Sequence, residues 1–193
     1  MSNTKVRPLF SAVQDNPLNL PHSYTDTPAG MQPTPFQQQQ AVMTAAGTIM
    51  SICATAPATY DEAGYTASGM VFTPIGEITD MGSHGKTSAE ITHKPIATRW
   101  VQVFKGSHDV GTMTVQLAIN TADPGQIIAQ QVSDTDENCS IKIEYPNGDA
   151  DYMQAMIFGF PRTISGVDTI VNASINVRGT GAGGVGVVYV VNS

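Results

Sequence analysis

The chain has 193 residues, of which 41% are apolar and only 13% charged, and its net charge is −7. Charged residues make up about a quarter of a typical soluble domain, so we expect other copies of the chain to cover much of this surface. The nine Lys and Arg residues are scattered singly, which excludes tight binding to nucleic acid, because such binding needs clustered cations. No stretch approaches the roughly 20 apolar residues that span a bilayer, which excludes a membrane role.

The first segment, residues 1–46, differs in composition from the rest. Its first forty residues contain six of the twelve prolines and end in the run Gln37-Gln38-Gln39-Gln40. Proline removes backbone donors and restricts φ, so we expect extended chain rather than a packed sheet. Three interpretations stay open: an arm on a neighbouring subunit, a strap on its own domain, or a disordered tail. We predict that a single β-domain occupies residues 47–193.

Strands separated by Gly, Pro and Asp turns are predicted along this domain. They cover residues 48–54, 70–77, 87–93, 99–105, 113–119, 140–145, 152–158, 170–178 and 185–191. One helix is expected between the fifth and sixth of these, with Asp123 as its N-cap and Pro124 at its first position. Its apolar stripe consists of Ile127, Ile128, Val132 and Gln131, and it ends near Asp134.

Alternation along the strands predicts which side chains are buried. After a strand at 99–105 and a turn at 106–109, apolar Met113, Val115 and Leu117 alternate with polar Thr112, Thr114 and Gln116. These two segments are predicted to form a hairpin with one buried face. In 170–178, four apolar residues alternate with Asn172, Ser174, Asn176 and Arg178. The fold class that follows is mainly β: an antiparallel β-sandwich or flattened barrel with one packed α-helix.

Motifs for catalysis or cofactor binding are not found. The four histidines match no zinc-ligand spacing, and residues 179–186 (GTGAGGVG) lack the Gly-Lys-Ser/Thr ending of a phosphate loop. Acidic residues at 134–137 and 149–151 form no calcium loop. No apolar leader opens the chain, so we expect a reducing compartment, with Cys53 and Cys139 unpaired and buried. We predict a protein that is not an enzyme and has no metal or cofactor.

The order of several segments resembles that of phage major tail (tail tube) proteins. A strand at 48–56 is followed by PATYDEAGY (57–65) and FTPIGEITDMG (72–82). ITHKP (91–95) then precedes TRWVQVFKGS (98–107), and GTMTVQLAINTADPGQ (111–126) leads into the helix. The resemblance covers residues 47–178. The long leader and the Gly-rich end after Arg178 depart from the pattern, and both bear on contacts between rings.

The resemblance implies a virion protein of a long-tailed bacteriophage, assembled in the host cytoplasm. Its subunits would form hexameric rings that stack into a hollow tube, through which DNA passes without specific binding. Tape-measure, tail-terminator and distal tail proteins would be its partners besides itself. A long hairpin or loop at residues 81–96 would reach the adjacent ring. Its candidate contact residues are Met81, Ser83, His84, Lys86, His93 and Lys94.

The lining of the channel has two candidate faces on this interpretation, because polar side chains with few cations would let DNA slide. They are Thr112, Thr114 and Gln116, or Asn172, Ser174 and Asn176, and Arg178 argues against the second set. Two other functions remain open from sequence: an immunoglobulin-like or carbohydrate-binding module that decorates a virion or cell surface, and the tube of a contractile secretion machine. Ring formation would separate the first of these from a tube protein.

Overall fold

The computed structural model describes residues 42–192. From Met43 onward these residues belong to one compact unit. The predicted N-terminal arm therefore lies almost wholly outside the described residues. In chain order the elements are β1 (Ile49–Cys53), α1 (Glu62–Tyr65), β2 (Thr73–Pro74), β3 (Ile78–Asp80), β4 (Thr87–His93), β5 (Gln102–Asp109), β6 (Thr112–Ala118), α2 (Pro124–Ser133), β7 (Cys139–Glu144), β8 (Ala150–Gly159), β9 (Arg162–Thr163), β10 (Asn172–Gly179), the 3₁₀ turn η3 (Ala182–Gly184) and β11 (Val188–Val190).

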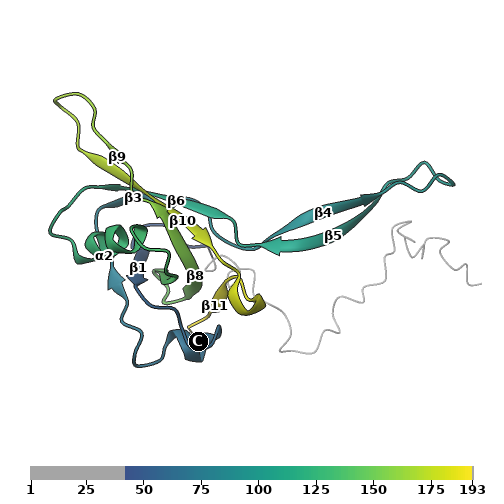
Figure 1. The fold of residues 1–193 in the computed structure, drawn as a ribbon, viewed down its shortest axis with the longest axis horizontal. Helices are drawn as coiled ribbons and strands as arrows, with labels where there is room; N and C mark the ends of the chain where they lie inside the picture. Colours follow the sequence, from purple (N-terminus) through teal and green to yellow (C-terminus); the bar gives the residue numbers. More distant parts are fainter. Residues whose placement is uncertain (1–41, 193) are drawn as a thin grey trace, which may run out of the picture. The chain divides into compact units, whose positions relative to one another are not determined.

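Nine of these strands form one antiparallel sheet that curls around the core (Figure 1). Its order is β2-β1-β7-β8-β10-β6-β3, with β11 paired to β8 and β9 paired to β10. Helix α2 packs against β8, β1 and β2. The predicted fold class is confirmed: a mainly β, flattened sandwich with one helix packed on it. The nine predicted strands fall short of the eleven in the described residues, because β3 and β9 are too short to show a period.

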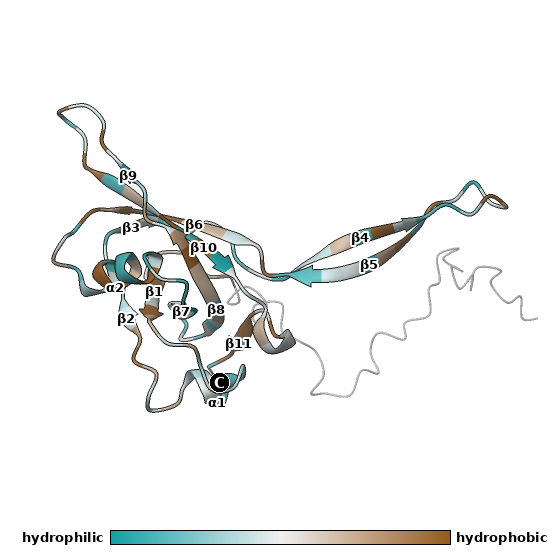
Figure 2. Ribbon diagram, viewed as in Figure 1, coloured by the Kyte–Doolittle hydropathy of each residue, from teal (hydrophilic) through white to brown (hydrophobic). Residues whose placement is uncertain are grey.

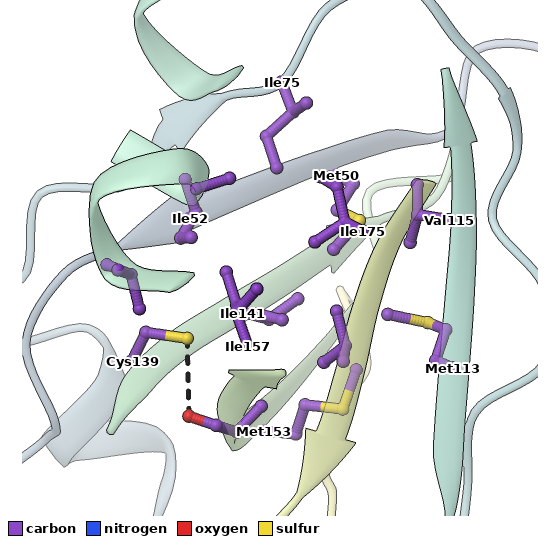
Figure 3. Close-up of a cluster of buried hydrophobic side chains, with 14 of the residues drawn as sticks. Met50, Ile52, Ile75, Met113, Val115, Cys139, Ile141, Met153, Ile157 and Ile175 are labelled. Carbon is purple, nitrogen blue, oxygen red and sulfur yellow. Dashed lines mark hydrogen bonds between the residues drawn. The ribbon is translucent and has the colours of Figure 1, made fainter. Parts of the chain in front are cut away.

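The core is a continuous apolar cluster inside the curled sheet (Figure 3). Met113, Val115 and Leu117 of β6 are all buried, as the alternation predicted. Ile175 and Val177 of β10 are buried beside them, and β7 and β8 contribute further side chains to the same cluster. Burying a large aliphatic side chain contributes about 1.5–3 kcal/mol, so this cluster is the main source of stability.

Helix α2 begins and ends where the sequence predicted. Asp123 is the N-cap, Pro124 occupies the first turn, and Asp134 is the C-cap. The predicted apolar stripe is partly wrong, however. Ile127 is 42% exposed and Gln131 is also exposed. The buried face consists of Gly125, Gln126, Ala129 and Val132. The difference arises because Gln126 is buried through hydrogen bonds, which an apolar count does not detect.

Strand β5 differs from its prediction more than any other element described. The predicted turn at 106–109 is strand, and β5 pairs with β4 rather than with β6. Every residue of β5 is exposed except the half-buried Gly106, so the predicted hairpin with one buried face does not exist. Strands β4 and β5 instead form a separate two-stranded sheet that projects from the curled body (Figure 1). Alternation cannot distinguish a half-buried strand from a projecting one.

Two smaller segments also differ from expectation. The predicted loop after β1 contains α1, and the strand predicted at 70–77 is reduced to β2. The turn between β7 and β8 is confirmed, but only Gly148 of its Asn-Gly pair has a positive φ, of 90°. The final strand shortens to β11 and pairs with the first residues of β8, as in Val188 opposite Tyr152.

Candidate assembly surfaces

The two candidate channel faces lie on one surface. Strands β6 and β10 are neighbours, with Ser174 opposite Gln116 and Asn176 opposite Thr114. Because the facing apolar residues all point into the core, the polar residues of both strands share the outer face. Ser174 Oγ donates to Gln116 Oε1 at 2.8 Å, which ties the two strands across this face. Thr112, Thr114, Gln116, Asn172, Ser174 and Asn176 are exposed or half-buried together. The sequence predicted both sets but not their adjacency.

Arg178 also lies on this polar face, opposite Thr112. Its Nη2 donates to both carboxylate oxygens of Asp109, at 3.0 and 2.8 Å. The backbone N–H of Gly111 and then the Arg178 guanidinium hold the pKa of Asp109 below its usual 3.8. The adjacent Asp109 carboxylate therefore neutralises the Arg178 guanidinium, and Arg178 adds no net positive charge to this face.

A second surface is the projecting hairpin of β4 and β5, which we call the arm. Figure 2 shows hydrophobic stretches along it. Ile91 lies directly opposite Phe104, whereas Val103 lies opposite Thr92, so the two pairs occupy opposite faces of the hairpin. Ile91, Val103 and Phe104 are each more than half exposed, and Trp100 near the turn is 84% exposed. Exposed apolar side chains gathered this densely are typical of a protein-binding surface.

The arm also gathers charge. Lys94, Arg99 and Lys105 lie between residues 91 and 105, a stretch without an acidic residue. Because β4 and β5 are antiparallel, cations that are separate in sequence come together on one projection. This part of a chain with net charge −7 is therefore positive.

The predicted inter-ring residues divide between the root of the arm and its outer half. Met81 packs against the core cluster and His84 is half-buried, whereas Ser83 and Lys86 are exposed. His93 ends β4, and Lys94 follows it in the turn region. The predicted loop at 81–96 is thus the root and one strand of a hairpin that continues to Asp109. The sequence missed the second strand because it was expected to pair with β6.

His84 fastens the root of the arm to the body. Its Nε2 lies 2.8 Å from Asp151 Oδ2, and Tyr145 Oη donates to the same carboxylate oxygen at 2.7 Å. Burial, followed by the neighbouring Asp151, raises the pKa of Tyr145. The tyrosine therefore remains a neutral donor at physiological pH. This trio holds the first residues of the arm against β8.

A third surface is the hairpin of β9 and β10, whose tip spans residues 164–171. Ile164 is 78% exposed, Ile170 is 70% exposed and Val167 is fully exposed. Asp168 is the single charged residue of the tip. The sequence analysis did not identify this surface. The available signal was a set of apolar residues with one charge (ISGVDTIV), in a segment too rich in turn formers for a buried strand.

Two motifs that carried the resemblance meet at the entry to α2. Asp123 Oδ1 accepts from the Gln126 backbone N–H at 2.8 Å, and its Oδ2 accepts from the Gly76 N–H at 3.0 Å. Gln126 Nε2 donates to the carbonyls of Gly76 and Ala118 at 3.1 and 3.0 Å. A Cβ on Gly125 would overlap the Pro74 carbonyl oxygen. The Asp-Pro-Gly-Gln segment therefore has a structural role: it locks α2 to the chain between β2 and β3.

The motif PATYDEAGY (57–65), which also carried the resemblance, has a structural role around α1 as well. Asp61 caps α1 by accepting from the Gly64 N–H at 2.8 Å. Tyr65 is buried and stacks on Tyr152, with ring centroids 5.3 Å apart. Burial raises the pKa of Tyr65 to about 12. These residues hold the loop after β1 on the body.

Between residues 42 and 192, no three His, Cys, Asp or Glu side chains come together as metal ligands. No helix within the same residues has the length and apolarity to cross a membrane. Both cysteines are buried and unpaired, as predicted. Burial raises the pKa of Cys139 to about 12, and its Sγ donates to the Ala155 carbonyl at 3.3 Å (Figure 3).

Known proteins share this architecture. The structure is similar to a protein in the tail of an empty GTA particle solved with C6 symmetry (TM-score 0.54, 12% identity, covering 73% of this chain and 96% of that one). It is also similar to the SPP1 tail tube (TM-score 0.51, 16% identity, 75% and 77%) and to a protein of the six-fold symmetrised anti-feeding prophage baseplate (TM-score 0.51, 8% identity, 72% and 91%). At these identities the likeness establishes a common fold. No curated protein sequence matches the chain.

The sequence itself matches a protein family over residues 60–186, described as "Lambda phage tail tube protein, TTP". The match begins at Tyr60, within the PATYDEAGY motif, ends just before β11, and includes the arm, the Asp-Pro-Gly-Gln segment at α2 and the β6–β10 face. The resemblance inferred from the sequence is confirmed, and so is the prediction of a structural protein rather than an enzyme. The chain belongs to the lambda phage tail tube protein family.

Proposed function

We propose that the chain polymerises with copies of itself as stacked hexameric rings, and that these rings form the tube of a phage tail. The arm is the observation that carries this proposal. It has large apolar side chains on both faces, and nothing in its own body covers them. A single flat contact would leave one face in water, so the arm is suited to insertion between neighbouring subunits. The six-fold symmetry of two similar structures supports the number six.

The outer face of β6 and β10 is the lining that we propose for the channel. Its side chains are Thr112, Thr114, Gln116, Asn172, Ser174 and Asn176, which offer hydroxyls and amides rather than cations. DNA phosphates bind strongly where Lys or Arg side chains release counterions. On this face Arg178 is paired with Asp109, so the surface offers no unpaired cation from these strands. DNA would pass without specific binding.

The arm and its root would make the contact between rings. The contact would involve Met81, Ser83, His84, Lys86, His93 and Lys94 as predicted, and the remaining residues up to Asp109. His84 and Met81 would orient the arm, since both contact the body. His93, Lys94 and the apolar pairs beyond them would meet the neighbour. Tape-measure, terminator and distal tail proteins would contact the ends of the tube, which would be assembled in the host cytoplasm and reside in the virion.

Electron microscopy of the purified full chain tests this function. Negatively stained samples over a range of concentrations should contain rings or tubes with a central channel, and light scattering should give a ring mass of six subunits. A protein that stays monomeric at high concentration, with virions whose tubes lack the chain, would contradict it. Stabilisation of such a monomer by an oligosaccharide would instead favour the carbohydrate-binding alternative.

A further inference from the structure

The arm and the β9–β10 hairpin project from opposite ends of one strand pair. The arm ends at Asp109, and β6 begins just after it at Thr112. The β9–β10 tip ends where β10 begins, at Asn172. In the antiparallel register, Asn172 lies opposite Ala118, while Arg178 lies opposite Thr112. The tip is therefore at the Ala118 end of β6 and the arm is at the other end, as Figure 1 shows.

Both projections expose apolar side chains that their own body leaves uncovered. On the arm these are Ile91, Ile96, Trp100, Val103 and Phe104, and on the tip they are Ile164, Val167 and Ile170. Scattered exposed apolar residues are ordinary, but two concentrated sets on projecting hairpins indicate two interaction surfaces. Each surface is an exposed hairpin, and such edges invite contact with another chain.

The outer half of the arm is positive, whereas residues 163–171 of the tip carry a single charge, that of Asp168. The outer arm has Lys94, Arg99 and Lys105, and its one acidic residue from 90 to 105 is Glu90, which lies opposite Lys105, so it remains positive. The tip has Asp168 and no cation from 163 to 177, and Glu77 lies at the same end, because its carbonyl accepts from the Ala118 N–H at 2.9 Å. Arg162 at the base of the tip keeps its positive charge, because its partner at 3.1 Å is the neutral Gln130. Contact between two arms would bring like charges together, whereas contact between arm and tip would pair opposite charges.

We propose that the outer half of the arm of one copy packs against the β9–β10 tip of the next copy along the tube. This inference rests on the proposed stacking of the chain. A contact between two different surfaces at opposite ends repeats from copy to copy and builds an open filament. The seven residues of β4 extend about 24 Å at the usual rise per strand residue. The arm is therefore long enough to lie along a neighbouring body rather than merely touch its edge.

Cross-linking between engineered cysteines tests the contact. The variant Ile96→Cys/Val167→Cys carries one thiol on each projection, and the native Cys53 and Cys139 are buried. Tubes of this variant treated with a short bis-maleimide should give a ladder of dimers, trimers and longer products on a denaturing gel. A ladder is expected because the two thiols lie at opposite ends of each copy. The matched control Ile96→Cys/Ala68→Cys has its second thiol at an exposed site in the loop after α1 and should give no ladder.

A charge variant of the tip tests the same contact without engineered cysteines. Ile164→Asp/Val167→Asp should leave the melting temperature of the unassembled chain unchanged, because both side chains are exposed. It should raise the concentration needed for tube formation about tenfold or more, since two apolar groups would no longer be covered. Val71→Asp is the control, because Val71 is 70% exposed on the segment before β2; it should assemble normally.

The outcomes separate this contact from the proposed function. Normal tubes without a cysteine ladder, a ladder of equal strength in the control, or normal assembly of the tip variant would each overturn the arm–tip contact and leave the tube function intact. An unmodified chain that forms neither rings nor tubes would overturn both.

Discussion

Asp123 serves two elements at once. One carboxylate oxygen caps α2 and the other binds the Gly76 N–H, while Gln126 satisfies three backbone groups around the same junction. Gly76 and Gln126 are 50 residues apart in the chain. The residues that carried the family resemblance therefore maintain the geometry between helix and sheet.

Replacing Asp123 by Ala should lower the free energy of unfolding by about 2 kcal/mol, because a helix cap and a tertiary hydrogen bond are lost together. Urea unfolding followed by circular dichroism would measure the change. Asp134→Ala is a matched control at the other end of α2, where the cap is formed by the backbone N–H, and should change stability by less than about 0.5 kcal/mol. Equal losses for the two variants would show that the carboxylate of Asp123 is not a specific tie.

Asp109 should make the fold sensitive to acid. Its pKa in the folded chain lies below the usual 3.8, through the Gly111 N–H and the Arg178 guanidinium. The stabilisation is therefore fully present above about pH 4 and is lost as the pH falls through the lowered pKa. Asp61, whose pKa is lowered first by the Thr59 hydroxyl and then by the Gly64 N–H, acts in the same direction.

The variant Asp109→Asn should therefore lose less stability than the parent when the pH is lowered from 5 to below 3. Urea unfolding at several pH values would show the difference. Arg178→Gln removes one of the two main donors and should reproduce part of this effect. A parent and an Asp109→Asn variant with parallel pH profiles would exclude the carboxylate as a source of acid sensitivity.

Strands β4 and β5 are stabilised by each other and not by the core. All their residues except the half-buried Gly106 are exposed, and none belongs to the buried clusters described for residues 42–192. A two-stranded hairpin alone is marginally stable in water. The arm therefore contributes little to the stability of its own subunit, and its apolar residues are available for a neighbour.

At concentrations too low for tube formation, replacing residues 90–105 by Asn-Gly should leave the melting temperature within about 2 °C of the parent, because no core contact is removed. Ring stacking should be lost. Calorimetry and negative-stain microscopy would measure the two properties separately. The milder variant Ile91→Thr/Phe104→Thr keeps the hairpin length and removes one apolar face, and it should weaken stacking as well. Normal tubes from the shortened chain would show that the arm is dispensable.

The β6–β10 face allows a test of the channel lining by charge. Gln116→Lys would add a free cation to a face whose existing Arg178 is paired, and phosphates would then be attracted. We expect normal tubes, but a smaller fraction of the virions should be infectious and DNA ejection should be slower. Gln116→Glu is the matched control with opposite charge and should eject normally. Equal infectivity of the two variants would indicate that this face does not line the channel.

At the scale of the whole molecule, a curled body carries two projecting hairpins at opposite ends (Figure 1). The body buries its large aliphatic side chains in one cluster, whereas both projections expose theirs. Burying those surfaces between copies should stabilise the folded chain by mass action. The melting temperature of the parent should therefore rise with protein concentration across the range where tubes form.

Differential scanning calorimetry at concentrations spanning a hundredfold would detect this coupling. The chain with residues 90–105 replaced by Asn-Gly should melt at one temperature throughout, and it serves as the control. A parent whose melting temperature does not change while tubes form would mean that assembly buries little of the exposed apolar surface.

Local patterns in the sequence determined much of the body. Alternation identified the buried residues of β6 and β10, Asp123 and Pro124 marked the start of α2, and Asn147-Gly148 marked the turn between β7 and β8. These features depend on neighbours within a few residues, so they are readable without the fold. The family resemblance, carried by motifs in order, added the tube.

Only the tertiary structure decided which strands pair. A two-residue period indicates which side chains share a face of a strand. It does not indicate which other strand is its neighbour in the sheet. For that reason the sequence predicts that β5 pairs with β6, whereas it pairs with β4. The sequence also offers the two candidate channel faces as alternatives, although the pairing of β6 with β10 makes them one surface. The arm and the tip likewise became opposite ends of one molecule only through the register of β6 and β10, because pairing is set by residues far apart in the chain.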